Sequence, residues 1–127
     1  MTEIEAVKNA QRLCHVLQAI ARIQRSVNGI AKDEFFANED KQGNVIHCIE
    51  IVGEAVNHLS SEITDTHPEF PWRAIVGMRN HLIHGYNEID VEYVWTAVKN
   101  DLVPLEEKAR QILSEIQLPD DFTPPSL

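Results

Sequence analysis

The stretch VIHCIEIVGEAVNHLSSEI, residues 45–63, decides the fold class. Its apolar side chains recur every three or four residues, which is the period of one face of an α-helix. They are Val45, Ile49, Val52, Val56, Leu59 and Ile63. A narrow apolar seam of this kind packs against an antiparallel helix. We therefore predict a long helix over about residues 39–61 in an all-α protein.

The N-terminal segment predicts a second long helix, over about residues 3–28. Its apolar side chains follow the same spacing, with one interval of six residues across Ala10; they are Ile4, Val7, Leu13, Val16, Leu17, Ile20, Ile23 and Val27. Thr2 can cap the N-terminus of this helix, and Asn28-Gly29 is a stop signal.

Two shorter segments follow these helices, one after each. A short helical piece is expected at Asp33–Ala37, where Phe35 and Phe36 offer contacts to the core. Residues 60–71 are expected to form a connector, because they end in two closely spaced prolines.

A third helix is expected to begin at Pro71 or Trp72, run to about His84 and stop at Gly85, a residue suited to a left-handed C-cap. Its predicted buried stripe comprises Trp72, Ile75, Val76, Leu82 and Ile83.

Asp90 is a good N-cap for a fourth helix over about residues 91–116. Pro104 lies inside this segment and should kink the helix or split it in two. Together the four long helices and the short pieces predict an up-down helical bundle.

Length and composition fit one domain, which we place at residues 1–117, followed by an extended proline-rich tail at 118–127. No apolar run approaches the length of a membrane span, and the acidic N-terminus does not resemble a signal peptide. We therefore expect a cytoplasmic protein without a membrane partner. Cys14 and Cys48 are far apart and are expected to be buried, reduced thiols.

The formal net charge of −9 is unevenly distributed. Residues 1–32 carry five basic and two acidic side chains, whereas residues 33–70 carry one basic and nine acidic side chains. A general nucleic-acid binder would present a broad basic face, so any RNA site must be local, and we expect no binding to DNA. Arg22 and Arg25, one helical turn apart, could extend a phosphate track, although a solvated helix face is the simpler interpretation.

The residues best suited to catalysis or ligand binding are Arg79 and Asn80, followed along the chain by His84, Gly85 and Tyr86. On a continuous helix Arg79 would project near the buried stripe, where a guanidinium requires a carboxylate, a dimer partner or a phosphate. Asn80 and His84, four residues apart, would share a neighbouring face.

This set suits phosphodiester chemistry on RNA. An imidazole can take the proton of a 2′-hydroxyl or protonate the leaving oxygen, and a guanidinium can bind the phosphate and stabilise developing charge. The attacking hydroxyl belongs to the substrate, so neither a metal nor another cofactor is required.

Other interpretations of these residues remain open. Glu54 on the preceding helix could pair with Arg79, either as a structural ion pair or as a support for the site. His81 and His84 have a spacing that metals can use, but no third ligand of matching spacing is evident.

The segment around Arg79 resembles the HepT-like branch of the HEPN superfamily, whose motif is arginine, four residues, histidine, any residue, tyrosine. Here these positions are Arg79, His84 and Tyr86. The likeness covers about residues 4–115, and it includes Gly53-Glu54-Ala55 and the Pro71-Trp72 entry to the motif helix.

The resemblance implies an all-α toxin of a type II/VII-like toxin–antitoxin module, acting as a metal-independent endoribonuclease. It implies a homodimer whose motif helices line one cleft, with Arg79 and His84 as the catalytic pair, assisted by Asn80. It also implies a partner, a minimal nucleotidyltransferase antitoxin (MntA-like), which inactivates the toxin by adding AMP to Tyr86. The added phosphodiester would bring charge and bulk into a phosphate site.

A rival hypothesis from another functional class is a non-catalytic companion subunit that binds a nucleotide or substrate for a nucleotidyltransferase. A plain structural dimerisation bundle is a third possibility, but it leaves the polar cluster unexplained.

Overall fold

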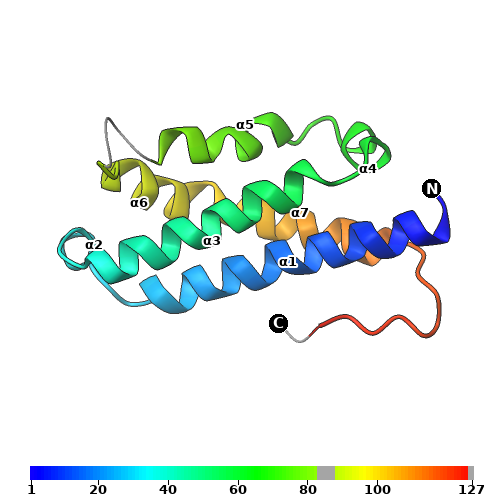
Figure 1. Ribbon diagram of the computed structural model, residues 1–127, viewed down its shortest axis with the longest axis horizontal. Helices are drawn as coiled ribbons and strands as arrows, with labels where there is room; N and C mark the ends of the chain where they lie inside the picture. The colour runs from blue at the N-terminus through cyan, green and yellow to red at the C-terminus, as the bar shows by residue number, and fades with distance from the viewer. Residues whose placement is uncertain (83–87, 126–127) are drawn as a thin grey trace.

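The computed structural model describes residues 1–82 and 88–125, and within these ranges the protein is an all-α bundle without a β-strand. Its elements are α1 (Glu3–Val27), α2 (Lys32–Phe36), α3 (Glu39–Asn57), α4 (Ser61–Thr66), α5 (Trp72–Gly77), the 3-10 helix η1 (Met78–His81), α6 (Val91–Asn100) and α7 (Leu102–Glu115). Figure 1 shows α1, α3 and α5 alternating in direction along the long axis, with α6 and α7 returning behind them.

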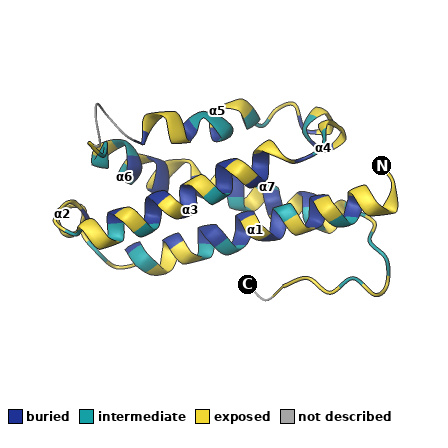
Figure 2. Cartoon of the chain, viewed as in Figure 1, coloured by how far each residue is buried: buried dark blue, intermediate teal, exposed yellow. Residues whose placement is uncertain are grey.

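The antiparallel pair α1 and α3 forms the most extensive helix–helix contact (Figure 1). All six residues of the predicted seam are buried. On α1 the interval of six residues contains Ala10, which is fully buried, so the apolar face continues across it. Figure 2 shows the buried residues of α1 and α3 alternating with exposed ones, as expected of helices with one apolar face.

Both predicted ends of α1 are confirmed. The Thr2 side chain accepts a hydrogen bond from the Glu5 backbone, and the Glu5 carboxylate accepts one from the Thr2 backbone, so the two form a capping box. Asn28 is the C-cap. Gly29 has a φ of 77°, in the left-handed region that glycine adopts more easily than residues with a side chain. Ile4, which the periodicity assigned to the apolar side, is instead 69% exposed, because the first turn extends beyond the core.

The short helix α2 is confirmed, but only one of its two phenylalanines contacts the core. Phe35 is fully buried with its ring centroid 5.3 Å from that of Trp95, whereas Phe36 is 40% exposed. Adjacent residues on a helix point about 100° apart, so a helix of one turn can bury only one of them. The buried Gln42 amide donates to the carbonyls of Phe35 and Phe36, which lie at the end of α2.

The expected third helix differs from the observed structure. The α-helix begins at Trp72 as predicted but ends at Gly77, and the chain continues as the 3-10 helix η1. The expected continuation to His84 and the stop at Gly85 lie outside the described residues. The expected connector before it also contains a short helix, α4, which the sequence pattern did not reveal.

The fourth helical segment is split, as Pro104 predicted. Asp90 caps α6 by accepting a hydrogen bond from the Tyr93 backbone. The break falls at Asp101, three residues before the proline. Pro104 is thereby placed in the first turn of α7, where a missing N–H costs nothing and its ring no longer clashes with a preceding helical turn.

The two cysteines are buried, as the sequence predicted. Cys14 and Cys48 are buried free thiols, and burial raises the pKa of both. Residues 117–125 form no helix after α7 ends, and Figure 1 shows this segment turning back along the bundle. None of the helices in the described ranges is long and apolar enough to cross a membrane.

Candidate functional site

Arg79 lies on η1 and points outward from the bundle. Its side chain is 59% exposed, so the expected position near the buried stripe is wrong. The buried positions in this segment are Ile75, Met78 and Leu82. Arg79 follows Met78 directly, and neighbouring residues on a helix project in different directions. The guanidinium is therefore solvated and accessible to a ligand.

Glu54 of α3 lies opposite this guanidinium, as the sequence suggested. The distance between Arg79 Nη1 and Glu54 Oε2 is 3.9 Å, and the Glu54 side chain is 61% exposed. This separation is at the outer limit of an ion pair, and exposed pairs contribute little to stability. The arrangement leaves the N–H groups of Arg79 free to turn toward a phosphate.

The sequence did not single out His58 and Arg12, which complete this polar cluster. His58 Nδ1 lies 3.4 Å from Glu54 Oε1 and 2.8 Å from the Glu54 carbonyl oxygen. Arg12 of α1 donates from Nη1 to the His58 carbonyl, at 2.6 Å. The cluster thus joins α1, the end of α3 and η1. The one available sequence signal was the spacing of Glu54 and His58, which are four residues apart on one helix.

Arg79 stands where two surface hollows meet. The first, which we call the α1–α3 groove, is lined by polar side chains from both helices, among them Lys8, Arg12, His15, His47, Glu50, Glu54 and His58. The second, the α4–α5 hollow, is lined by the end of α3 and the segment from α4 to η1, including Asn57, Phe70, Trp72, Arg73 and Asn80. Arg79 lines both.

The structure therefore brings together three of the residues singled out from sequence. Arg79 and Asn80 are adjacent exposed residues of η1, and Glu54 faces Arg79 from α3. His84 and Tyr86 lie outside the described residues, so their positions relative to Arg79 are not part of this geometry.

His81 packs against an aromatic ring rather than joining a cluster of ligands. Its ring centroid lies 5.2 Å from that of Tyr93, and burial, followed by the charges of Asp101 and Asp90, raises the pKa of the Tyr93 hydroxyl. Within residues 1–82 and 88–125, no group of three or more His, Cys, Asp or Glu side chains is arranged to hold a metal ion.

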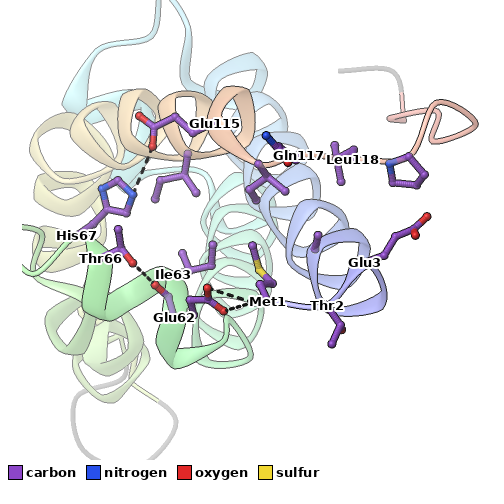
Figure 3. A pocket seen from close by; sticks show the side chains of 14 residues that line it. Met1, Thr2, Glu3, Glu62, Ile63, Thr66, His67, Glu115, Gln117 and Leu118 are labelled. Atoms are coloured by element: carbon purple, nitrogen blue, oxygen red, sulfur yellow. Dashed lines mark hydrogen bonds and ion pairs between the residues drawn. The ribbon is translucent and has the colours of Figure 1, made fainter.

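A further hollow lies at one end of the bundle, between the N-terminus, α4 and the end of α7 (Figure 3). His67 is only 9% exposed there, and its Nε2 lies 3.6 Å from Glu115 Oε2. None of the residues predicted for chemistry lines this hollow, so we regard it as part of the scaffold.

Comparison with known proteins identifies the family of the chain. The family model described as "Ribonuclease HepT-like" matches residues 16–112, which include α3 and the whole Arg79–Tyr86 segment. The protein named "Probable ribonuclease HepT" from Thermococcus cleftensis is 34% identical over 97 residues, covering 76% of this chain and 88% of that protein.

Two other relatives also have names that describe a ribonuclease. A "Putative RNase" from Caldanaerobacter subterraneus subsp. tengcongensis is 31% identical over 101 residues, covering 80% of this chain and 90% of the relative. A "Gamma-glutamylcyclotransferase and putative RNase" from Methanocaldococcus jannaschii is 34% identical over 104 residues, covering 82% of this chain but 47% of that longer protein. No solved structure gives a significant match. The chain belongs to the ribonuclease HepT-like family.

Proposed function

We propose that this protein is a metal-independent endoribonuclease whose catalytic residues are Arg79, His84 and Asn80. The observation that carries the proposal is the position of Arg79, an exposed guanidinium where two hollows meet, within a chain that belongs to a ribonuclease family. A solvated cation at such a junction can hold a phosphate while the flanking nucleotides extend to either side.

The proposed reaction needs only groups of the protein and the substrate. An imidazole accepts the 2′-hydroxyl proton, the 2′-oxygen attacks the adjacent phosphorus, and the bond from phosphorus to the 5′-oxygen breaks. The 5′-oxygen takes a proton from an imidazolium, leaving a 2′,3′-cyclic phosphate and a 5′-hydroxyl end. Arg79 would stabilise the charge on the phosphoryl oxygens in the transition state, and Asn80 would donate a further hydrogen bond.

A homodimer fits this chemistry. The described residues of one chain place Arg79 and Asn80 together on η1. A second copy across a two-fold axis would add another Arg79 and a second His84, so one imidazole could serve as base and the other as acid. Two guanidinium groups would also offset the acidic character of the chain locally.

We further propose that the protein is the toxin of a two-component toxin–antitoxin module and that a minimal nucleotidyltransferase silences it by transferring AMP to Tyr86. The physical reason is charge, because each phosphodiester on a tyrosine two residues from His84 would compete with the substrate phosphate for Arg79. Incubation with such an enzyme and ATP should add AMP to wild-type protein but not to Tyr86→Phe. Equal modification of both proteins would exclude Tyr86 as the acceptor.

The central test is RNA cleavage by the purified, unmodified protein in excess EDTA. Wild type should cut and leave 2′,3′-cyclic phosphate ends, and His84→Ala should lose the activity. His81→Ala is the matched control, because it removes the other imidazole of the same segment, and it should still cut. Absence of cleavage by unmodified wild type would favour a binding role in which Arg79 holds a nucleotide.

A further inference from the structure

A line of basic side chains runs along the exposed face of α1. Lys8, Arg12, His15, Arg22 and Arg25 recur at helical spacing, and we call them the basic stripe. At about 1.5 Å per residue the stripe extends roughly 26 Å along the helix. Arg12 is half-buried and the other four are exposed.

The stripe borders two hollows that adjoin each other beside α3. Lys8, Arg12 and His15 line the α1–α3 groove, which Arg79 also lines. A second hollow, lined by Arg22 and Arg25, shares His15 and Ile51 with that groove. The stripe thus shares a groove with the residue proposed to hold the scissile phosphate.

The charge of this surface is opposite to that of the whole protein. The two hollows together contain five lysine or arginine side chains and two carboxylates, those of Glu50 and Glu54, so their net charge is +3. The chain as a whole carries −9, which leaves −12 for the remainder. An anionic ligand would therefore be held along the stripe and repelled elsewhere.

The local contacts leave the basic groups able to bind a ligand. Arg12 uses Nη1 for the His58 carbonyl, which fixes the side chain while other guanidinium N–H groups remain to donate. The distance from Arg22 Nη2 to Asn44 Oδ1 is 3.5 Å, the limit of a hydrogen bond. Burial raises the pKa of the Cys48 thiol, and the positive charges of Arg22 and Arg25 partly offset this increase.

We infer that the basic stripe is a phosphate track that binds the backbone of single-stranded RNA and leads it toward Arg79. The inference rests on the proposed function. Phosphates repeat regularly along an RNA chain, and spaced lysines and arginines contact them without reading the bases. The track would hold RNA on one side of the cleavage site, and it explains how an acidic protein can bind an acidic substrate.

The test measures binding apart from cleavage. A fluorescein-labelled 2′-O-methyl oligonucleotide of about 12 residues, a length within the usual range for single-strand sites, cannot supply an attacking 2′-hydroxyl. Its affinity is measured by anisotropy at several salt concentrations. The test variant is Arg22→Gln/Arg25→Gln, and the matched control is Arg110→Gln/Lys32→Gln; both lower the net charge from −9 to −11.

The track predicts on the order of tenfold weaker binding by the test variant at about 50 mM salt. The slope of the logarithm of the binding constant against the logarithm of the salt concentration should be shallower by roughly 1.4. The control should bind like wild type. Equal weakening of both variants, or no weakening of the test variant, would overturn the track even if wild type cuts RNA normally. Wild type that binds the probe but cuts no RNA would instead contradict the ribonuclease proposal.

Light scattering and thermal unfolding complete the test. The test variant should keep the wild-type particle mass and unfolding midpoint, because Arg22 and Arg25 are exposed. A change from the wild-type mass would show that this face joins two copies of the chain, and the assignment to RNA would then be wrong.

Discussion

The guanidinium of Arg79 and the carboxylate of Glu54 lie 3.9 Å apart, with both side chains more than half exposed. His58 contacts the other oxygen of the same carboxylate, with Nδ1 at 3.4 Å from Oε1. Glu54 therefore stands between an imidazole and the cation proposed to bind phosphate. A carboxylate placed in this way can hold Arg79 in position and release it when a phosphate arrives.

Replacing Glu54 separates a positioning role from a structural one. Glu54→Gln should change the free energy of unfolding by less than about 1 kcal/mol, because exposed ion pairs contribute little. As a positioning residue it should lower kcat for RNA cleavage without raising KM, since removing a negative charge does not weaken RNA binding. A purely structural pair would instead leave kcat unchanged. Glu50→Gln, in the same groove, is the matched control.

The two phenylalanines of α2 provide a stability test with an internal control. Phe35→Ala should cost about 3–5 kcal/mol in the free energy of unfolding, because it empties a fully buried site against Trp95. Phe36→Ala should cost less than about 1 kcal/mol, the value of a weak cation–π contact with Lys32. Urea unfolding measures both; similar costs would mean that the assignment of the buried ring is wrong.

Asn9 is a buried polar residue that links α1 to the chain entering α4. Its Nδ2 donates to Ser60 Oγ at 2.9 Å, and its Oδ1 accepts from the Ser60 backbone at 3.0 Å. Asn9→Ala should destabilise the fold by about 1–3 kcal/mol, because both bonds are lost. Ser60→Ala should cost less, because it keeps the backbone bond. Equal costs in chemical unfolding would show that the backbone bond contributes nothing.

Acid should weaken the contact between Glu69 and α7. The hydrogen bond from Lys108 Nζ, 2.7 Å from Glu69 Oε1, lowers the pKa of Glu69 below its ordinary value of 4.5. A carboxyl whose pKa is lowered by folding adds stability that is fully present above the unfolded pKa and lost as the pH falls through the folded one.

The difference in unfolding free energy between wild type and Glu69→Gln should therefore stay constant above about pH 5 and shrink below it. Urea titrations from neutral to acidic pH give this difference directly. A difference that does not change with pH would exclude a titrating contact.

Helical periodicity predicted the core well where helices are long. The seam of α3 and most apolar positions of α1 are buried as expected, and the caps at Thr2 and Asp90 have the predicted hydrogen bonds. These features depend on local spacing and on backbone groups within one turn, which the sequence contains directly.

The site was less predictable because it depends on a change of helix type. A continuous α-helix from Trp72 was expected to place Arg79 near the buried stripe, but the chain changes to the 3-10 helix η1 at Met78, where each residue turns about 20° further, and Arg79 is exposed. Spacing within a segment also says nothing of what another helix contributes, so Arg12 and His58 were missed. The family resemblance, by contrast, depended on the residue types and spacing of the motif, and the match over residues 16–112 confirms it.

The catalytic role of Arg79 is tested most directly by the rate of RNA cleavage by Arg79→Ala in excess EDTA, beside wild type and Arg110→Ala. Arg110 is an exposed arginine of α7, so its removal changes the net charge equally. We expect a loss of about 100-fold or more for Arg79→Ala, as for other groups that stabilise transition-state charge, and an unchanged rate for Arg110→Ala. Cleavage by Arg79→Ala at the wild-type rate would contradict a catalytic role for Arg79.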